Sequence, residues 1–437
     1  MIESVRTWHL LQSIRRSARQ SCRNLPRMQE ELLRTAVAHG YQNVPFYRRV
    51  WDEAGFDPGS VQGIDDLRRL PIIAGRQVRE AVRSGELLAR DVDPSQCTLF
   101  HSTGTSGVPL AVRRQALERR LWRVAGLRML LEHGFRWWHA TVQFDPPPGP
   151  LHILQQLGIV RTTWIPGTLP LHDQLDRLRA ARAQAVIGTP TRLRRICGAI
   201  EATGGGVHKP RHVFSQGEVL DRETRATVRR VLGADPVSVY GLTELGYVAW
   251  QCEDHESFHV NAELFVVEVL RDGRPARPGE LGAIVVTNLR GRTMPLLRYD
   301  TGDLAIAADG GCPCGRPLPR LASIEGRPQA SVLLQDGRVV TTRAIVDHLA
   351  GSLRLDEYRL HQETERRFRL EVAPGTFAEG PGGASGGADR CEKARVLAVL
   401  RELLGEVDIR IEVATSWASA GAEKTHPVSC ALPLRLG

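Results

Sequence analysis

Lysine is rare in this chain, and one lysine lies where a mobile loop could bring it to a reaction. Among 58 lysine and arginine residues, only Lys209, Lys393 and Lys424 are lysines. Lys424 follows a run of small residues that begins at Ser419 and is typical of a flexible loop. A lysine ammonium is a compact charge on a flexible stem, which suits the charge that develops on oxygen during acyl or phosphoryl transfer. Lys424 alone also fits a solvated surface side chain, so its catalytic role depends on the other motifs.

A loop of hydroxyl and glycine residues could hold phosphate groups. It reads Ser102-Thr103-Gly104-Thr105-Ser106-Gly107, and Val108 follows it. Its hydroxyls and uncrowded backbone N–H groups provide closely spaced donors to an anion. The loop lacks the Gly-Lys-Ser/Thr ending of a Walker loop, which argues against a P-loop NTPase. Loops of this composition also occur without a ligand.

Three further motifs could complete a nucleotide site. Tyr240-Gly241-Leu242-Thr243-Glu244 directly follows a predicted strand, so its ring could stack on a base and its carboxylate could hold Mg²⁺. Asp303 follows a glycine turn in Arg298-Tyr299-Asp300-Thr301-Gly302-Asp303 and could accept hydrogen bonds from two ribose hydroxyls. Gly326-Arg327 stands at a predicted domain junction. These residues also have structural explanations: Tyr240 as a core aromatic, Glu244 as a charge at a helix N-terminus and Asp303 as a turn residue.

Four residues have the side chains and spacing of a zinc site. Cys312 and Cys314 form a tight Cys-Pro-Cys-Gly pair, and Cys252 and His259 precede a predicted hairpin that could bring the two pairs together. Three thiolates and one imidazole suit a closed, tetrahedral, structural Zn²⁺ site. His255 is the alternative imidazole, and buried cysteines without a metal are the alternative to the site.

The elements that position these motifs predict an α/β fold in two domains. Residues 1 to about 95 have helical apolar spacing, residues 97–240 alternate short strands with helices, and residues 260–308 are rich in strands. A smaller unit follows, so we predict domains 1–325 and 326–437. Within them we expect strands at 140–144, 185–188, 213–215, 237–240, 264–270, 283–287, 331–335, 338–341, 357–361, 367–372 and 407–413, and helices at 171–182, 343–351 and 391–405.

Composition narrows the class of protein. The net charge is +9, but the arginines are spread along the chain without a basic tail or an aromatic-rich basic strand, which argues against nucleic-acid binding. No apolar run approaches the roughly 20 residues needed to cross a bilayer, and no secretory leader is recognisable. We therefore expect a cytoplasmic protein without a membrane partner; a homodimer is left open.

The order of the motifs resembles the adenylate-forming superfamily, which includes acyl-CoA synthetases. Within it the chain is most similar to the branch of phenylacetate–CoA ligases and capsule-biosynthesis adenylating proteins, from about residue 30 to 435. The motifs that carry the resemblance are Val44-Pro45-Phe46-Tyr47, Thr103 to Gly107, Tyr240 to Glu244, Cys252 with His259, Met294 to Asp303, and Cys312-Pro313-Cys314-Gly315-Arg316.

The resemblance implies a fold and a two-step reaction. The fold is a large N-terminal domain, with parallel sheets, helices and a small β-rich subdomain, followed by a small α+β lid domain. In the reaction, a carboxylate attacks the α-phosphate of ATP to give acyl-AMP and pyrophosphate. An acceptor, usually the thiol of CoA, then displaces AMP.

The resemblance also implies which residues bind the nucleotide. Ser102 to Gly107 would hold the phosphates. Gly217 and Glu218 would line the adenine pocket, and Tyr240, next to Gly241, would stack on adenine.

Five residues would meet the phosphates, the metal and the ribose. Thr243 and Glu244 would organise phosphate and Mg²⁺, Asp303 would hold the ribose and Arg327 would reach the nucleotide. Lys424 would be the mobile catalytic lysine that stabilises charge at the pentavalent phosphorus.

Three departures from the family pattern point to a specialised member. Val108 replaces the lysine that usually follows the phosphate loop, so pyrophosphate would rely on Arg113 or Arg114. The hinge run 326–330 lacks the usual acidic residue, which puts CoA as acceptor in doubt. Thr425 replaces the basic residue that usually follows the catalytic lysine.

We expect an ATP- and Mg²⁺-dependent ligase that adenylates a small aromatic carboxylic acid and transfers it to CoA. One alternative is transfer to a carrier-protein thiol or an amine, and another is an inactive nucleotide-binding protein. The acid pocket is expected between residues 135 and 245, and several of the candidate aromatics are expected to be core residues instead. The candidate lining residues are Trp137, Trp138, His139, Phe144, His152, Arg161, Trp164 and Phe214.

Overall fold

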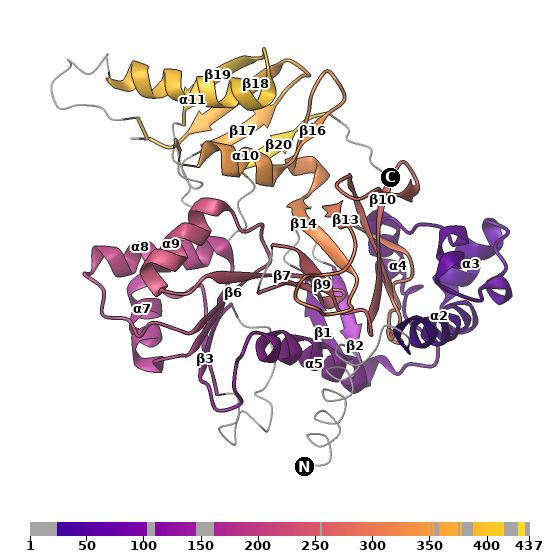
Figure 1. The fold of residues 1–437 in the computed structure, drawn as a ribbon. Helices are drawn as coiled ribbons and strands as arrows, with labels where there is room; N and C mark the ends of the chain where they lie inside the picture. The colour runs from indigo at the N-terminus through magenta and orange to yellow at the C-terminus, as the bar shows by residue number, and fades with distance from the viewer. Residues whose placement is uncertain are drawn as a thin grey trace.

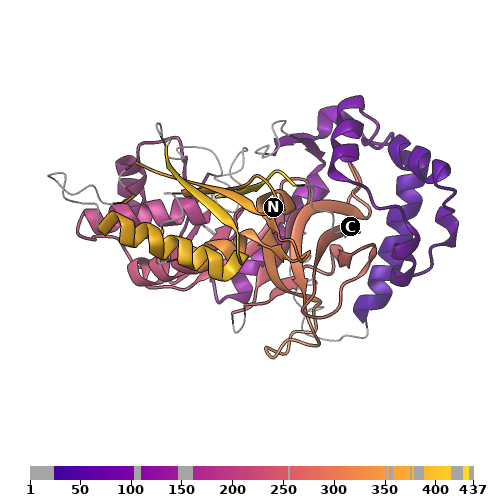
Figure 2. The ribbon, with the colours of Figure 1, turned by 90° about the horizontal axis from the view of Figure 1, so that it is seen from above.

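A computed structural model describes most of the chain as a large mixed sheet with helices and a smaller C-terminal unit (Figures 1 and 2). The described residues are 24–102, 110–145, 161–253, 256–350, 352–353, 358–374, 376–377, 388–414 and 427–432, with the side chains of 388–390 excluded. None of the helices in these ranges is long and apolar enough to span a membrane.

Five neighbouring strands of a twelve-stranded sheet are parallel, in the order β4-β3-β5-β6-β7. Successive residues such as Val213 and Phe214 are both fully buried but belong to different cores, because they point to opposite faces of the sheet. Three helices cover one face and α5 (Ala116–Glu132) covers the other. The strands are β3 (Thr141–Phe144), β4 (Thr162–Ile165), β5 (Ala185–Gly188), β6 (His212–Gln216) and β7 (Pro236–Leu242), and the three helices are α7 (Leu171–Ala181), α8 (Pro190–Ala202) and α9 (Arg222–Leu232).

The other seven strands continue the same sheet from β7 with antiparallel pairing. Their order is β8-β9-β14-β13-β12-β10-β11, so the strand-rich region is continuous with the parallel strands. The predicted hairpin of 264–270 and 283–287 is confirmed as the β10–β12 pair. The strands are β8 (Gly246–Gln251), β9 (Phe258–Val260), β10 (Phe265–Arg271), β11 (Arg274–Pro275), β12 (Leu281–Asn288), β13 (Tyr299–Ala307) and β14 (Arg320–Gly326).

A separate hairpin supports the hydroxyl-rich loop. Its strands, β1 (Thr98–His101) and β2 (Ala111–Arg114), pair so that His101 faces Ala111. Ser102 extends the pairing, since its N–H donates to the carbonyl of Leu110 at 2.9 Å and its hydroxyl accepts from the Leu110 N–H at 2.8 Å. The two ends of the loop are thereby held together, while residues 103–109 lie outside the described part of the chain.

The N-terminal helices pack beside the antiparallel strands (Figure 1). Tyr47 is fully buried and its hydroxyl donates to the Pro295 carbonyl at 3.0 Å and accepts from the Leu297 N–H at 2.8 Å. This hydrogen bonding ties the helices to the segment that leads into β13. The helices are α2 (Asn24–Asn43), α3 (Pro45–Glu53) and α4 (Gly75–Ser84), with short 3-10 turns η1 (Pro58–Ser60), η2 (Ile64–Arg69) and η3 (Pro94–Gln96).

The C-terminal unit has its own sheet and its own core. Its four-stranded sheet has the order β19-β18-β17-β20, and α10 and α11 pack together against a core that includes Leu360, Phe368 and Leu400. The elements are η4 (Pro328–Ala330), β15 (Val332–Leu333), β16 (Val339–Val340), α10 (Thr342–Leu349), β17 (Tyr358–Gln362), β18 (Arg367–Val372), α11 (Ala388–Leu404), β19 (Asp408–Val413) and β20 (Val428–Cys430).

Polar contacts join the C-terminal unit to the large sheet. The carboxylate of Asp347 accepts from the Arg222 N–H, at the first turn of α9, at 2.8 Å. Thr341 donates to the buried carboxylate of Glu325 at 2.7 Å. The unit therefore sits above the carboxyl-end side of the parallel strands (Figure 1).

The α/β fold class is confirmed, and the predicted elements agree with the structure to within a few residues. The predicted helix 171–182 corresponds to α7, and the predicted strand 367–372 corresponds to β18. The sequence did not reveal β8, β9, β14 or β20. Two of these, β9 and β20, have only three residues, too few for a detectable alternation of apolar side chains.

Candidate nucleotide site and cysteine cluster

Tyr240, on β7, meets Asp303, on β13, although three strands lie between β7 and β13 in the sheet order. The Tyr240 hydroxyl donates to Asp303 Oδ2 at 2.9 Å and lies 3.3 Å from Thr301 Oγ1. The large sheet must therefore curl, because distant strands of a flat sheet could not touch. Arg327, directly after β14, donates from Nε to Asp303 Oδ1 at 3.3 Å.

Burial controls the ionisation of this pair. The side chain of Asp303 is 13% exposed, and burial raises its pKa above the usual value, while Arg327 and the Tyr240 hydrogen bond act to lower it. Burial, with Asp303 beside it, raises the pKa of Tyr240 well above 10. The phenol therefore remains a donor, and the Asp303 carboxylate is the acceptor.

The acidic end of the Tyr240–Glu244 motif is held from two sides. Tyr299 donates from its hydroxyl to Glu244 Oε1 at 2.9 Å. Arg114, at the end of β2, donates from its guanidinium to the backbone carbonyl of Thr243. Arg114 is 6% exposed, so its side chain is buried behind the motif.

Gly241 allows the tight turn that presents this motif. A Cβ at Gly241 would lie 2.7 Å from the carbonyl oxygen of Gly246, which belongs to the backbone of β8. The β7–β8 register shifts between Tyr240 and Gly241. Gly246 has φ +87°, and a Cβ there would lie 2.6 Å from the ring of Trp122. Glycine is required at both ends of this turn.

Glu218 and Gly217 lie at the carboxyl end of β6. Gly217 has φ +83°, in the region that favours glycine. Glu218 Oε2 accepts from the Thr191 N–H at 3.1 Å and from its hydroxyl at 2.7 Å, at the first turn of α8. The carboxyl ends of β6 and β7 thus carry these residues along the same edge of the sheet, where open α/β sheets bind ligands.

Most of the expected acid-pocket residues lie elsewhere. Trp137 and Trp138 are 54% and 53% exposed, and they precede β3, at the amino end of the parallel strands. Phe144 and Phe214 are 2% and 0% exposed within hydrophobic cores. The expectation that these four aromatic residues line the acid pocket is therefore corrected. The sequence does not distinguish an aromatic side chain in the core or in a loop from one that lines a pocket.

Three more of the expected residues are also placed away from the carboxyl edge or outside the described chain. His139 and Arg161 precede β3 and β4 at the same amino end, where the Thr141 N–H donates to the Arg161 carbonyl at 2.7 Å. His152 lies outside the described residues.

An ion pair that no sequence motif indicated lies at the carboxyl edge. Arg192, 8% exposed, approaches Asp145 Oδ2 at 3.4 Å, and the Gly167 N–H donates to Asp145 Oδ1 at 2.7 Å. A Cβ at Gly167 would lie 2.0 Å from the Arg192 guanidinium and 2.3 Å from Asp145 Oδ1, so a larger residue there would displace the ion pair. Asp145 and Gly167 follow β3 and β4, and Arg192 lies in the first turn of α8, so no single sequence window contains them.

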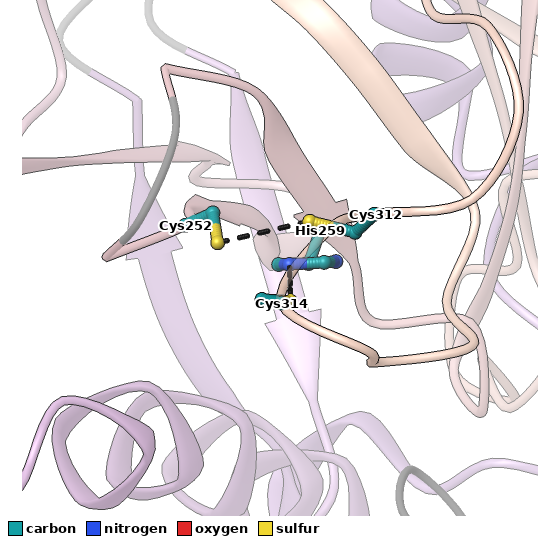
Figure 3. Close-up of side chains that lie close together, drawn as sticks. All are labelled: Cys252, His259, Cys312 and Cys314. Carbon is teal, nitrogen blue, oxygen red and sulfur yellow. Dashed lines mark hydrogen bonds between the residues drawn. The ribbon is translucent and has the colours of Figure 1, made fainter.

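The four predicted metal ligands come together in one cluster, drawn in Figure 3. Their ligand atoms lie within 4.8 Å of one another. Cys252 Sγ and Cys312 Sγ are 3.8 Å apart, and Cys314 Sγ is 3.3 Å from His259 Nε2. Tetrahedral zinc with Zn–S bonds of about 2.3 Å would place two sulfurs about 3.8 Å apart. The sulfur–sulfur distance is far too long for a disulfide and fits a shared metal.

The chemistry of the four side chains also fits a metal. Burial lowers the pKa of His259 to about 4, so the imidazole is neutral and Nε2 can act as a ligand. Burial acts to raise the pKa of Cys314, but hydrogen bonds from Arg316 and the neighbouring thiols bring it below the usual value. The pairing of β9 with β14, in which His259 faces Arg320, brings the two halves of the cluster together.

Some predicted site residues lie outside the described part of the chain. They are Thr103, Gly104, Thr105, Ser106, Gly107, Lys424 and the alternative ligand His255.

Comparison with known proteins finds relatives over most of the chain. No protein-family model matches. The chain is 30% identical over 373 residues to phenylacetate-coenzyme A ligase of Thermus thermophilus, covering 79% of this chain and 82% of the relative. It is 26% identical over 348 residues to phenylacetate-coenzyme A ligase of Pseudomonas putida, covering 76% and 77%.

The fold is shared with a solved ligase. The structure of 2-hydroxyisobutyryl-CoA ligase in its postadenylation state matches with a TM-score of 0.77 at 18% identity, over 94% of this chain and 90% of that one. The likeness extends across both the large sheet and the C-terminal unit.

We predict that Gly241→Ala destabilises the protein. The new methyl group would meet the Gly246 carbonyl oxygen at 2.7 Å, and β7 and β8 would have to separate to relieve the contact. Overpacking of this kind costs about 1–3 kcal/mol, which a lower midpoint of thermal or urea unfolding would report.

Gly198→Ala is the matched control. Gly198 lies within α8, and a Cβ there would have no neighbour within 4 Å. Alanine is favoured over glycine in a helix by about 0.5–1 kcal/mol, so this variant should be slightly more stable. Equal stability of the two variants would contradict the packing argument.

Proposed function

The chain belongs to the phenylacetate–CoA ligase family of adenylate-forming enzymes, and from this premise we propose that it activates a small aromatic carboxylic acid. It forms an acyl-adenylate from ATP and transfers the acyl group to CoA. The observation that carries the proposal is the family membership, together with the contact of Tyr240, Asp303 and Arg327 from three strands of the sheet. The aromatic nature of the acid is the proposed part.

The nucleoside would bind at the carboxyl ends of β6 and β7. We propose that the Tyr240 ring stacks on adenine beside Gly217 and Glu218. Asp303 would accept hydrogen bonds from the ribose, with Arg327 beside it. The direction of the Tyr240–Asp303 hydrogen bond supports this assignment, because it leaves Asp303 as an acceptor.

The reacting phosphates would meet hydroxyls and one carboxylate. The loop Ser102 to Gly107 would hold them, and Thr243 would contact them beside Glu244. A carboxylate oxygen is the ligand that Mg²⁺ prefers, so Glu244 fits a magnesium site. When bound, Mg²⁺ would neutralise charge on the phosphate oxygens. Lys424 would stabilise the charge that develops as the acid carboxylate attacks the α-phosphorus.

The division into domains 1–325 and 326–437 is part of the proposal. Separate hydrophobic cores on the two sides of residue 326 support it, since each unit can keep its own core if the other moves. Arg327 lies at this boundary and contacts Asp303, so a movement of the C-terminal unit would change what surrounds the ribose.

The test of function is pyrophosphate release from MgATP with a panel of aryl, arylacetic, hydroxy and fatty acids, with and without CoA. We predict release with one acid class and a fall of about 10²–10³-fold in Lys424→Ala, because removal of one preorganised charge donor has that effect. Lys209→Ala is the control, because Lys209 is exposed and far from Lys424 in the sequence. Equal loss in both variants, or release without any acid, would reject the proposal.

The acceptor is decided by the same assay. Acyl-CoA formation with AMP release would establish thioester synthesis. Acyl-AMP that accumulates with CoA, yet turns over with a carrier-protein thiol or an amine, would favour the alternative acceptor. The hinge sequence Pro328-Gln329, without an acidic residue, is the feature that keeps this alternative under test.

We predict that the pH dependence of ATP binding shifts in Tyr240→Phe. The Asp303 carboxylate loses its charge as pH falls through its pKa, which burial has raised. The Tyr240 hydrogen bond lowers that pKa, so its removal should move the acid limb of ATP affinity to higher pH, while the phenyl ring keeps its stacking.

Calorimetric titration of both proteins from pH 5 to 8 would measure the shift. Protonation of ATP itself affects both series equally and cancels. If the acid limb of ATP affinity in Tyr240→Phe stayed in place or moved to lower pH, the assignment of Asp303 to the ribose would be contradicted.

We propose that the cluster of Cys252, His259, Cys312 and Cys314 holds a structural Zn²⁺ ion. Four protein ligands would leave no open coordination position, which is typical of a structural site. The ion would fix the end of β8 and β9 to the loop between β13 and β14, where the spacing of the sulfurs already fits tetrahedral coordination.

Metal analysis should find about one zinc per chain, retained on dialysis and lost in Cys312→Ser. Cys391→Ser is the control, since Cys391 is exposed and remote from the cluster in sequence. Zinc-free protein after purification without chelators, or zinc kept by Cys312→Ser, would reject the site.

A further inference from the structure

Arg114 is a buried arginine that none of the nucleotide motifs includes. It ends β2, the strand that returns from the hydroxyl-rich loop, and its side chain is 6% exposed. Burial lowers the pKa of Arg114 to about 10, partly offset by Glu118 and Glu244. The guanidinium therefore remains charged at neutral pH. A buried charge needs compensation, so its surroundings indicate what it does.

Two aromatic rings and one carbonyl fix the guanidinium. Its central carbon lies 4.4 Å from the centre of the Trp122 ring and 5.3 Å from that of Phe100. One terminal nitrogen donates to the carbonyl of Thr243. The planar group stacks and donates at once, which a lysine ammonium does not reproduce.

The guanidinium has a further donor to offer. Nη1 of Arg114 is buried and has no hydrogen-bond partner among the described residues. A cavity of about 40 Å³ is lined in part by Arg114, Glu118 and Glu244. That volume could hold a few waters, at about 10–15 Å³ each, which would connect Arg114 to Glu244.

Glu118 is engaged elsewhere and does not neutralise Arg114 alone. Its carboxylate accepts from the N–H groups of Arg292 at 2.7 Å and Gln115 at 3.0 Å, and from Thr293. Glu244 accepts from Tyr299 on its other side. The charge of Arg114 is therefore shared between Glu118 and the turn that carries Thr243 and Glu244, and only the turn receives a hydrogen bond from the guanidinium among the described contacts.

We infer that Arg114 is a positioning residue for adenylation, which holds the Thr243–Glu244 turn so that its hydroxyl and carboxylate face the magnesium-bound phosphates. This inference rests on the proposed function. It also assigns Arg114 a role other than direct pyrophosphate binding, since the two rings and the Thr243 carbonyl already hold the guanidinium. Residues that orient a metal ligand typically change metal affinity or activity about 10–100-fold when replaced.

The experiment compares Arg114→Met and Arg114→Lys with wild type. The dissociation constant for ATP is measured by calorimetry at several Mg²⁺ concentrations. KM values for Mg²⁺, ATP and the acid, with kcat, come from pyrophosphate release. We expect Arg114→Met to weaken Mg²⁺-dependent ATP binding about 10–100-fold, with the KM for the acid unchanged, and Arg114→Lys to recover part of the loss.

Arg128→Lys is the matched control. Arg128 is also fully buried and lies 4.7 Å over the ring of Trp250, but it pairs with Glu263 at 2.6 Å, away from the nucleotide motifs. Arg128→Lys should lower the midpoint of unfolding, as Arg114→Lys does, but should leave the Mg²⁺ dependence of ATP binding unchanged. The same change of Mg²⁺ dependence in both lysine variants would reduce Arg114 to a general role in stability and overturn the inference.

The two proposals fail in different ways. Unchanged Mg²⁺ and ATP constants in folded Arg114→Met, or in Arg114→Lys if Arg114→Met does not fold, overturn the inference even when pyrophosphate release is intact. Wild-type protein that binds MgATP but releases no pyrophosphate with any acid overturns the proposed function. In that case calorimetry alone still decides the role of Arg114.

Discussion

The hydrogen bond between Tyr240 and Asp303 is the contact on which the candidate site depends. It joins β7 to β13 across the interior of a curled sheet, at 2.9 Å, although β8, β9 and β14 lie between them in the sheet order. The parallel strands supply a ligand-binding carboxyl edge, and the antiparallel strands supply the residues that close over it. Without the curl, each half of the sheet would carry an incomplete set of side chains.

The two carboxylates of the site are stabilised by the same kind of neighbours. Asp303 has the Tyr240 phenol and the Arg327 guanidinium, and Glu244 has the Tyr299 phenol and the charge of Arg114. A buried carboxylate is costly unless hydrogen bonds and an opposite charge compensate it. A phenol with a high pKa is a suitable donor, because it can neither lose its proton at neutral pH nor add a charge.

The sequence predicted these residues to the extent that each belonged to a short motif. Tyr240 and Asp303 stood out because glycines and hydroxyls flank them, and the Cys-Pro-Cys-Gly run pointed to the cluster that the structure brings together. Arg114 was one of two neighbouring arginines, and its contacts with Phe100, Trp122 and the Thr243 carbonyl, which distant segments supply, distinguish it from Arg113.

The residues that sequence reasoning missed are defined by contacts between distant segments. Arg192, in the first turn of α8, meets Asp145 and Gly167, which follow two different strands, and no motif marks any of the three residues. The aromatics expected in the acid pocket failed for a related reason. Trp137 stands at the amino end of β3 and Phe144 in a core, and the order of residues along the chain does not fix which edge or face a side chain takes.

The two arginines differ in a way that bears on the proposed reaction. Arg114 is 6% exposed and locked between two rings, whereas the Arg327 side chain is 38% exposed and sits at the boundary of the C-terminal unit. If that unit moves between half-reactions, Glu244 keeps its cation but Asp303 loses the contact with Arg327. The Asp303 carboxylate would then be left with the Tyr240 phenol and the ribose. Because an uncompensated buried charge is costly, a bound nucleotide would favour the moved position more than an empty site does. Under the proposed assignment of Asp303 to the ribose, nucleotide binding and the position of the C-terminal unit would therefore be coupled through one carboxylate, while Arg114 would keep its place beside Thr243.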